Sequence, residues 1–463
     1  MPTNRDKIEK WSLAYFLLKF YVDLGFRYYF RLSVSGIGNI PKDKAIIFAP
    51  NHQNALMDAL AVLCVKSWQP VFLARADIFE KPLLNKILTF LKILPVYRMR
   101  DGYSNLQKND DIFNKTIDVL RNGNGLVILP EGNHGDLKRL RPLKKGIARI
   151  GLQSEDASGG SLDIHIVPVG IDYTNYIKVG SKLHVRFGNA IGVKPFLKMY
   201  YDNPAKAYNT LIEHIEKGMR AEMIDINDEK YYTVYKVIID TFASEYISKM
   251  NLPNNHPNMV DAQMLCIEQI NKFRAKKPDD FLLLAADALE YNLLLSRRSL
   301  DPSIYKMSSR QKWSLIPLIV LLVGSLPIFV YSFINSIFPI VIAKMATAKI
   351  KDLQFISSVR FAIGLLLFPL FHIIQIVVFA LITKDLIYTL IYAASLPIGA
   401  FIVFEWKKRA ELVWARLREV KFNIFSPKRV KRLQELNVDI KNQMWKIVNF
   451  KEEEDYMSNS DAN

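Results

Sequence analysis

Cysteine is almost absent from this sequence. Cys64 and Cys266 are the only two among 463 residues, so the chain cannot carry a disulfide framework. A zinc site built from several cysteines is excluded for the same reason. This scarcity is typical of a protein part that faces a reducing, cytosolic compartment.

The sequence also lacks a cleavable secretory signal. The first thirty residues contain no short apolar core followed by a small-residue cleavage site, so we expect them to be retained. The chain shows neither internal repeats nor a recognisable nucleic-acid-binding motif. Its formal net charge of +17 nevertheless calls for an anionic partner. With nucleic acid set aside, the expected partners are membrane lipids and a phosphorylated substrate.

Long apolar runs near the C-terminus predict a membrane region at 313–406. Residues 315–343, 361–383 and 386–404 contain no charged side chain, and each run is about as long as the roughly 20 residues that cross a bilayer. Basic residues flank almost every loop beside these runs, and three simple spans cannot place all of them on the cytoplasmic side. We therefore expect 315–343 to fold back near Gly324–Pro327 as a re-entrant hairpin, while the other two runs cross.

The rest of the chain divides into four parts of different texture. Residues 1–38 contain an aromatic stretch in which a charged residue recurs every fourth position, which predicts an interfacial amphipathic helix. A helix packed on a soluble domain is the alternative. Residues 39–196 alternate strand-length apolar runs with helical stretches and predict an α/β domain, a buried sheet covered by helices. We expect a helical connector at 197–312, and a basic helix followed by an acidic, disordered tail at 407–463.

The first chemical motif is NHQNALMD, residues 51–58, directly after the apolar run AIIFAP. A histidine at the end of a strand can act as a base while a carboxylate orients its ring. Residues six apart on one helix are separated by about 240° of rotation. His52 and Asp58 therefore meet only if the histidine lies on a loop and the aspartate in the first turn of the next helix. The alternative is that Asp58 caps the helix and His52 is a turn residue.

A second motif, LPVYR, ends at Arg98, and Arg100 follows it. A guanidinium fork matches the oxygens of a phosphate group in a bidentate manner. Two arginines after a strand are also common as plain surface residues, and that alternative stays open.

The third motif is LPEGNHGD, residues 129–136, and it contains Glu131 and Gly132. Glycine allows the backbone to approach a ligand closely. His134 is a candidate second acid or base or, with Asp136, a metal ligand; the alternative is a polar loop residue. A run of basic residues follows: Lys138, Arg139, Arg141, Lys144 and Lys145.

A fourth motif, IVPVGI at 166–171, completes a series that resembles the glycerolipid acyltransferases, the family of the glycerol-3-phosphate and 1-acylglycerol-3-phosphate acyltransferases. That family carries Asn-His-x4-Asp, a strand ending in arginine, Phe-Pro-Glu-Gly-Thr-Arg-Ser and Val-Pro-Val/Ile-Gly in the same order. The likeness covers about a third of the chain, 40–195. This sequence departs from the pattern twice. Five residues separate His52 from Asp58, as in some eukaryotic-type members, and Asn133-His134 replaces Thr-Arg.

The resemblance implies a mixed α/β sheet and acyl transfer from acyl-CoA or acyl carrier protein to a glycerol hydroxyl. His52 would be the general base and Asp58 would orient it. Neither cysteine lies in a motif, so we expect no covalent acyl-enzyme, and no metal or cofactor is needed. We expect an integral membrane protein whose catalytic domain lies on the cytoplasmic face. The residues implied in binding the phosphorylated acceptor are Arg98, Arg100, Glu131, Gly132, Lys138 and Arg141.

The sequence leaves two rival functions open. The first is an acyltransferase for another lysolipid or for an amino-acid lipid. The second is a non-catalytic membrane scaffold that binds lipid on the same fold. A scaffold would be favoured if the longer spacing left His52 and Asp58 out of contact.

Overall fold

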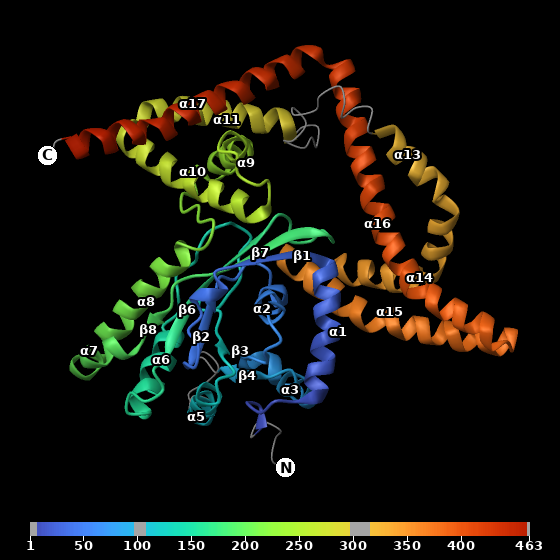
Figure 1. Ribbon diagram of the computed structural model, residues 1–463, viewed down its shortest axis with the longest axis horizontal. Coiled ribbons are helices and arrows are strands. Elements are labelled where there is room, and N and C mark those ends of the chain that lie inside the picture. Colours follow the sequence, from blue (N-terminus) through green and yellow to red (C-terminus); the bar gives the residue numbers. More distant parts are fainter. Residues whose placement is uncertain (1–6, 97–107, 297–314, 461–463) are drawn as a thin grey trace. The chain divides into compact units, whose positions relative to one another are not determined.

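The computed structural model describes residues 7–96, 108–296 and 315–460, and it divides into two compact units (Figure 1). Unit 1 comprises Met1–Asp225 together with Ile350–Phe361. Unit 2 comprises Ile226–Lys349 and Ala362–Asn463. Unit 1 therefore contains a short segment that is distant in the sequence from the rest of it.

Unit 1 is built on one mixed sheet in the order β1-β7-β6-β2-β5-β3-β4, with β8 beside β6. Neighbouring strands are parallel except where β6 pairs with β7 and β8. This arrangement confirms the expected mixed α/β sheet. The strands are β1 (Phe30–Ser35), β2 (Ile46–Pro50), β3 (Val71–Arg75), β4 (Ile93–Val96), β5 (Leu126–Val127), β6 (His165–Tyr173), β7 (Ser181–Phe187) and β8 (Ile191–Gly192).

Strand β2 lies inside the sheet, and all five of its residues are buried. Its side chains alternate between the two faces, as a strand requires. Ile47 and Ala49 join the main hydrophobic core, whereas Phe48 packs against Trp68 and Phe187. Both faces are thus covered, which explains why this strand is an unbroken apolar run.

Seven α-helices of unit 1 are described: α1 (Leu13–Tyr29), α2 (Leu56–Leu63), α3 (Pro82–Phe90), α5 (Lys108–Arg121), α6 (Gly146–Ala157), α7 (Leu197–Asp202) and α8 (Pro204–Arg220). Helix α8 packs on β2 and β6. Its buried residues recur every fourth position and form one stripe in the core. The boundary of this unit consequently lies at Asp225 and not at residue 196, because α7 and α8 complete the cover of the sheet.

Strand β1 was not among the expected elements, since residues 1–38 were predicted as an interfacial helix region. It pairs in parallel with β7. Ser33 and Ser35 bond through their hydroxyls to the two ring nitrogens of His184 on that neighbour, each at 3.1 Å. A short strand with alternating polar residues gives little local signal, and its partner lies about 150 residues away.

Helix α1 packs on the protein through three aromatic side chains and Lys19. Lys19 is only 3% exposed and forms an ion pair with Asp23 at 2.6 Å, and Arg27 donates to the backbone carbonyl of Cys64. Another stripe of the helix is apolar and exposed. A helix with such a stripe can present it to a greasy surface. The exposed residues of α1 and the segment before it include Trp11, Leu13, Leu17, Phe20 and Leu24.

Unit 2 contains a bundle in which α9 (Tyr232–Lys249), α10 (His256–Lys276) and α11 (Pro278–Ser296) pack with α17 (Pro427–Ser460). Helix α17 buries the stripe Leu433, Leu436, Ile440 and Met444. The backbone stays helical to Ser460, where the sequence predicted a disordered tail. Glutamate and lysine are good helix formers, so the acidic run continues a helix that the upstream stripe anchors.

The apolar part of unit 2 contains α13 (Leu315–Gly324), α14 (Leu326–Thr347), the greater part of α15 (Leu353–Thr383) and α16 (Leu386–Phe425). Helix α13 ends at Gly324 and α14 begins at Leu326, where a fold-back was expected. In contrast to a hairpin of two short arms, however, α14 has 22 residues and can cross by itself. Within the described ranges, α14, α15 and α16 are long and apolar enough to span a membrane, and they indicate membrane association.

Candidate active site

His52 and Asp58 lie where β2 gives way to α2. His52 is on the loop that follows Pro50, and Asp58 is in the first turn of α2. The imidazole Nδ1 is 2.9 Å from the Asp58 Oδ2. The six-residue separation thus brings the two side chains together at a junction of loop and helix, the one arrangement that the spacing allowed.

Asp58 is fully buried and accepts from four donors. Its Oδ2 accepts from His52 and from the backbone N–H groups of Gln53 at 2.7 Å and Asn54 at 2.6 Å. Its Oδ1 accepts from the hydroxyl of Tyr173 at 2.9 Å. Burial and the adjacent carboxylate raise the pKa of Tyr173 well above its ordinary value, so this hydroxyl stays a donor.

This network selects one tautomer of His52. A carboxylate offers only acceptors, so Nδ1 carries the hydrogen and Nε2 has a free lone pair. The His52 side chain is 16% exposed, which leaves part of the ring accessible. An oriented imidazole with a free Nε2 is the geometry of a general base.

The loop between His52 and Asp58 contains one unusual backbone conformation. Ala55 has φ 44° and ψ −123°, in the left-handed half of conformational space that favours glycine. Such a conformation costs about 1–3 kcal/mol in a residue with a side chain and persists only where the surroundings hold it. Ala55 lies in the turn between the two side chains, which are in contact despite the longer spacing.

Glu131 joins the His52 loop to the loop of the third motif. Its Oε1 accepts from the backbone N–H of His52 at 2.7 Å, and its Oε2 accepts from that of Arg141 at 3.1 Å. The residue is 3% exposed, and burial raises its pKa from 4.5 to about 7. Next to it Gly132 adopts φ 65°, the backbone conformation that glycine accommodates without strain.

His134 lies next to His52. The two ring centroids are 5.5 Å apart at 82°, and the far side of His134 contacts the ring of Phe355. Burial and the neighbouring His52 lower the pKa of His134. Within the described residues, no group of three His, Cys, Asp or Glu side chains could hold a metal ion.

Two of the basic residues predicted to bind the acceptor have partners inside the protein. Lys138 forms an ion pair with Asp172 at 2.5 Å, and the Arg141 guanidinium donates to the backbone carbonyl of His134. Arg98 and Arg100 lie outside the described residues. Acceptor binding by these four side chains, and by Glu131 and Gly132, stays a prediction.

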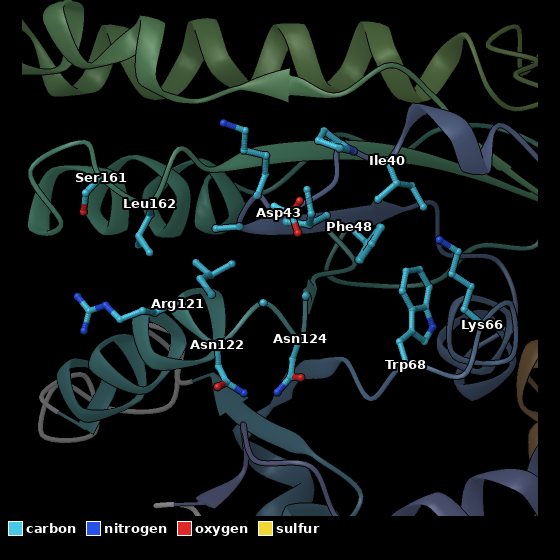
Figure 2. Close-up of a pocket in the computed structure, with 17 residues that line it drawn as sticks. Ile40, Asp43, Phe48, Lys66, Trp68, Arg121, Asn122, Asn124, Ser161 and Leu162 are labelled. Atoms are coloured by element: carbon cyan, nitrogen blue, oxygen red, sulfur yellow. The ribbon is translucent and has the colours of Figure 1, made fainter.

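A cavity of about 580 Å³ lies at the amino-terminal ends of strands β2 and β5 (Figure 2). It is lined by Ala45 and Ile46 at the start of β2 and by Gly125 just before β5. Figure 2 shows Phe48, Trp68 and Lys66 along its wall. His52 follows the carboxyl end of β2, so this cavity is not part of the site around His52. In open, mostly parallel sheets, ligands usually bind at the carboxyl ends of the strands.

Known proteins share this domain. A model of the acyltransferase family, described as Acyltransferase, matches residues 31–172. Residues 31–172 are an acyltransferase domain of the glycerolipid acyltransferase family. The range includes β1, the His52–Asp58 loop, the Glu131 loop and most of β6.

Three curated relatives resemble the acyltransferase domain and its surroundings. Glycerol-3-phosphate O-acyltransferase 1 of Saccharomyces cerevisiae is 28% identical over 145 residues, 31% of this chain and 19% of the relative. Glycerol-3-phosphate O-acyltransferase 2 of the same organism is 23% identical over 367 residues, 72% of this chain and 48% of the relative. The chloroplastic 1-acyl-sn-glycerol-3-phosphate acyltransferase LPAT1 of Arabidopsis thaliana is 24% identical over 178 residues, 38% of this chain and 46% of the relative. The chain therefore spans less than half the length of each.

A solved structure is also similar. The crystal structure of the 1-acyl-sn-glycerophosphate acyltransferase of Thermotoga maritima has 20% sequence identity and a TM-score of 0.32. The match covers 44% of this chain and 78% of that one.

Several residues of the acyltransferase domain had no role assigned from the sequence. Asn51 is buried and clamps Ile171 of β6, donating to its carbonyl at 3.1 Å and accepting from its N–H at 2.6 Å. Tyr173 lies two residues beyond that clamp. No local pattern pointed to it, because its place beside the His52 loop depends on the parallel pairing of β6 with β2.

Glu131 gives the acyltransferase domain a pH-dependent stability. Between pH 4.5 and about 7, the unfolded chain ionises this carboxyl while the folded protein keeps it protonated. The folded state therefore loses stability as pH rises through that window, by at most about 3 kcal/mol. Glutamine cannot titrate, so we expect the stability of Glu131→Gln to lack this decrease with rising pH.

Thermal unfolding of the wild type and the variant in detergent at pH about 5 and about 7.5 measures the effect. The stability of the wild type relative to the variant should be greater at the lower pH. An equal pH dependence in the two proteins would contradict the raised pKa of Glu131.

Proposed function

We propose that this chain is an integral membrane O-acyltransferase of phospholipid biosynthesis. It transfers a fatty acyl group from acyl-CoA or acyl carrier protein to the hydroxyl of glycerol-3-phosphate or 1-acylglycerol-3-phosphate. The observation that supports this proposal most directly is the 2.9 Å contact between His52 and Asp58 inside an acyltransferase domain. The contact also disfavours a non-catalytic scaffold, which the longer motif spacing had left open.

The chemistry follows from the orientation of His52. Its Nε2 takes the proton of the acceptor hydroxyl while that oxygen attacks the thioester carbonyl. The tetrahedral intermediate then collapses and the C–S bond breaks. The imidazolium returns the proton to the thiolate, which leaves as the free thiol. Asp58 stabilises the imidazolium through Nδ1 during the reaction.

A direct transfer, without an acyl-cysteine, agrees with the state of both thiols. Cys64 and Cys266 are buried. Burial raises the pKa of the Cys64 thiol well above its ordinary value and that of Cys266 to about 12. A buried thiol with a raised pKa is a poor nucleophile.

Exposed cations beside the Glu131 loop suit a phosphate-bearing acceptor. Lys144 and Lys145 are exposed, and the Lys144 side chain lies against Gly132. Because Lys138 and Arg141 have internal partners, these two lysines join Arg98 and Arg100 as candidates to contact the phosphate.

The membrane features suit greasy substrates. The apolar stripe of α1 faces away from unit 1, and three apolar helices long enough to span a bilayer follow in the chain. The basic residues at the ends of these helices favour the cytoplasmic face for the catalytic domain.

Transfer assays with purified protein in phosphatidylcholine nanodiscs test the proposal. Labelled acyl-CoA and acyl carrier protein would each be offered with glycerol-3-phosphate, with 1-acylglycerol-3-phosphate and with monoacylglycerol, which lacks the phosphate. We expect product with at least one phosphate-bearing acceptor and little with monoacylglycerol. Absence of transfer in every combination would contradict the function, and preference for monoacylglycerol would contradict the acceptor class.

A further inference from the structure

The segment Ile350–Phe361 belongs to unit 1, although the chain on both sides of it belongs to unit 2. It comprises the turn after α14 and the first residues of α15. Ile356, Ser357 and Ser358 are buried in its centre. A stretch between two apolar helices thus packs on the domain that carries the candidate active site.

Contacts along its length hold this segment on unit 1. The Ser357 hydroxyl donates to the side-chain Oδ1 of Asn54 at 2.7 Å, across 303 positions of sequence. The ring of Phe355 lies 4.5 Å from that of His134 at 85°. Phe361 packs edge-on against Phe26 of α1, with ring centroids 6.1 Å apart. Two of these contacts reach residues that are themselves next to His52 or in its loop.

Asn54 connects Ser357 to the catalytic pair. Its side chain accepts from Ser357, while its backbone N–H donates to Asp58 Oδ2 at 2.6 Å. The same Asp58 oxygen holds the His52 ring. We propose that Ser357 is a positioning residue that acts through Asn54 to hold the His52–Asp58 loop in its catalytic conformation. The effect of Ser357 on kcat rests on the proposed function.

The loop needs such support because of its own backbone. Ala55, next to Asn54, has φ 44°, a conformation that this residue does not prefer in isolation. Asn54 and Ser357 are both fully buried, so the bond between them is shielded from competing water. Removal of the hydroxyl would leave the Asn54 amide oxygen without that donor in a buried site, which is unfavourable.

The adjacent Ser358 provides a matched control. It is 6% exposed, and its hydroxyl has no hydrogen-bond partner in the part of the chain that the structure describes. Ser357→Ala and Ser358→Ala each remove one buried hydroxyl from the same helical turn. They differ in whether that hydroxyl contacts the catalytic loop.

We expect Ser357→Ala to lower kcat about tenfold, with less than about a twofold change in KM for either substrate. Hydrogen exchange of the backbone amides in the 52–58 loop should accelerate in this variant, because Gln53 and Asn54 would hold Asp58 less firmly. Ser358→Ala should match the wild type in kcat and in exchange. Ser357→Cys, which keeps a weak donor at the position, should fall between Ser357→Ala and the wild type.

Equal kcat and equal loop exchange in the two alanine variants would overturn the proposal, as would a rise in KM alone. If Ser357→Ala does not fold, the comparison of Ser357→Cys with Ser358→Ala decides in the same way. A wild type inactive on all acceptors would refute the proposed function, but loop exchange would still decide whether Ser357 holds the loop.

Discussion

Replacement of His52 by alanine is expected to lower kcat roughly 10²- to 10⁴-fold, the usual contribution of a positioned general base. The imidazole Nε2 is the free nitrogen of a ring that Asp58 orients at 2.9 Å. Without it the acceptor hydroxyl would attack with its proton still attached. Asp58 keeps its three other donors in this variant, so membrane insertion should be unchanged.

The comparison is sharpest with a second histidine of unit 1. His214 lies exposed on α8, where its ring contacts Phe196 and its Nδ1 lies 2.8 Å from the carbonyl oxygen of Thr210. We expect His214→Ala to retain wild-type kcat. Both variants would be assayed at saturating donor and acceptor after size-exclusion and circular dichroism checks. Substantial transfer by the His52 variant would remove this residue from the mechanism.

Replacement of Asp58 by asparagine is expected to have the second largest effect, for a different reason. The carboxylate accepts four hydrogen bonds, and the amide of asparagine can accept only on one atom. The amide NH₂ would take either the Oδ1 position, facing Tyr173, or the Oδ2 position, facing His52 and the two backbone donors of the loop. In the latter case the ring would carry its hydrogen on Nε2, and the base would be lost.

We expect Asp58→Asn to lower kcat roughly 10²-fold or more and to cost about 1–3 kcal/mol of stability, because buried donors lose their acceptor. Tyr173→Phe is the matched comparison, since it removes one of the four donors and leaves the carboxylate in place. Its loss of kcat should be much smaller. Steady-state kinetics and thermal unfolding of both proteins measure these effects, and an Asp58→Asn enzyme within about tenfold of the wild type would exclude the assigned role.

Much of the sheet was predictable because its strands are buried on both faces. Residues 45–50, 70–74, 165–171 and 182–188 are apolar runs of strand length, and strands lie at each. Strand β5 is shorter than the run GLVILP suggested, since the chain turns into the Glu131 loop after Val127. Edge strand β1 and the pairing of β8 depend on distant partners, so a local pattern could not reveal them.

In the candidate site, too, some features followed from local sequence and others depend on distant partners. The junction of loop and helix at His52 and Asp58 followed from helical geometry and a six-residue separation. Acceptor binding by Glu131 stays a prediction, and its hydrogen bonds to the backbone of His52 and Arg141 show a bridging position that its motif did not indicate. Lys138 and Arg141 likewise have internal partners that charge alone could not foresee.

The sequence by itself determined the acyltransferase motifs, the mixed sheet, the apolar helices and the way in which His52 and Asp58 could meet. These features are written in short motifs and in local periodicity, which act over a few neighbouring residues. Tertiary structure alone decided what surrounds the pair. Tyr173 and Ser357 reach the His52 loop from 115 and 303 positions away, and contacts between buried side chains of such separation arise only when the chain packs.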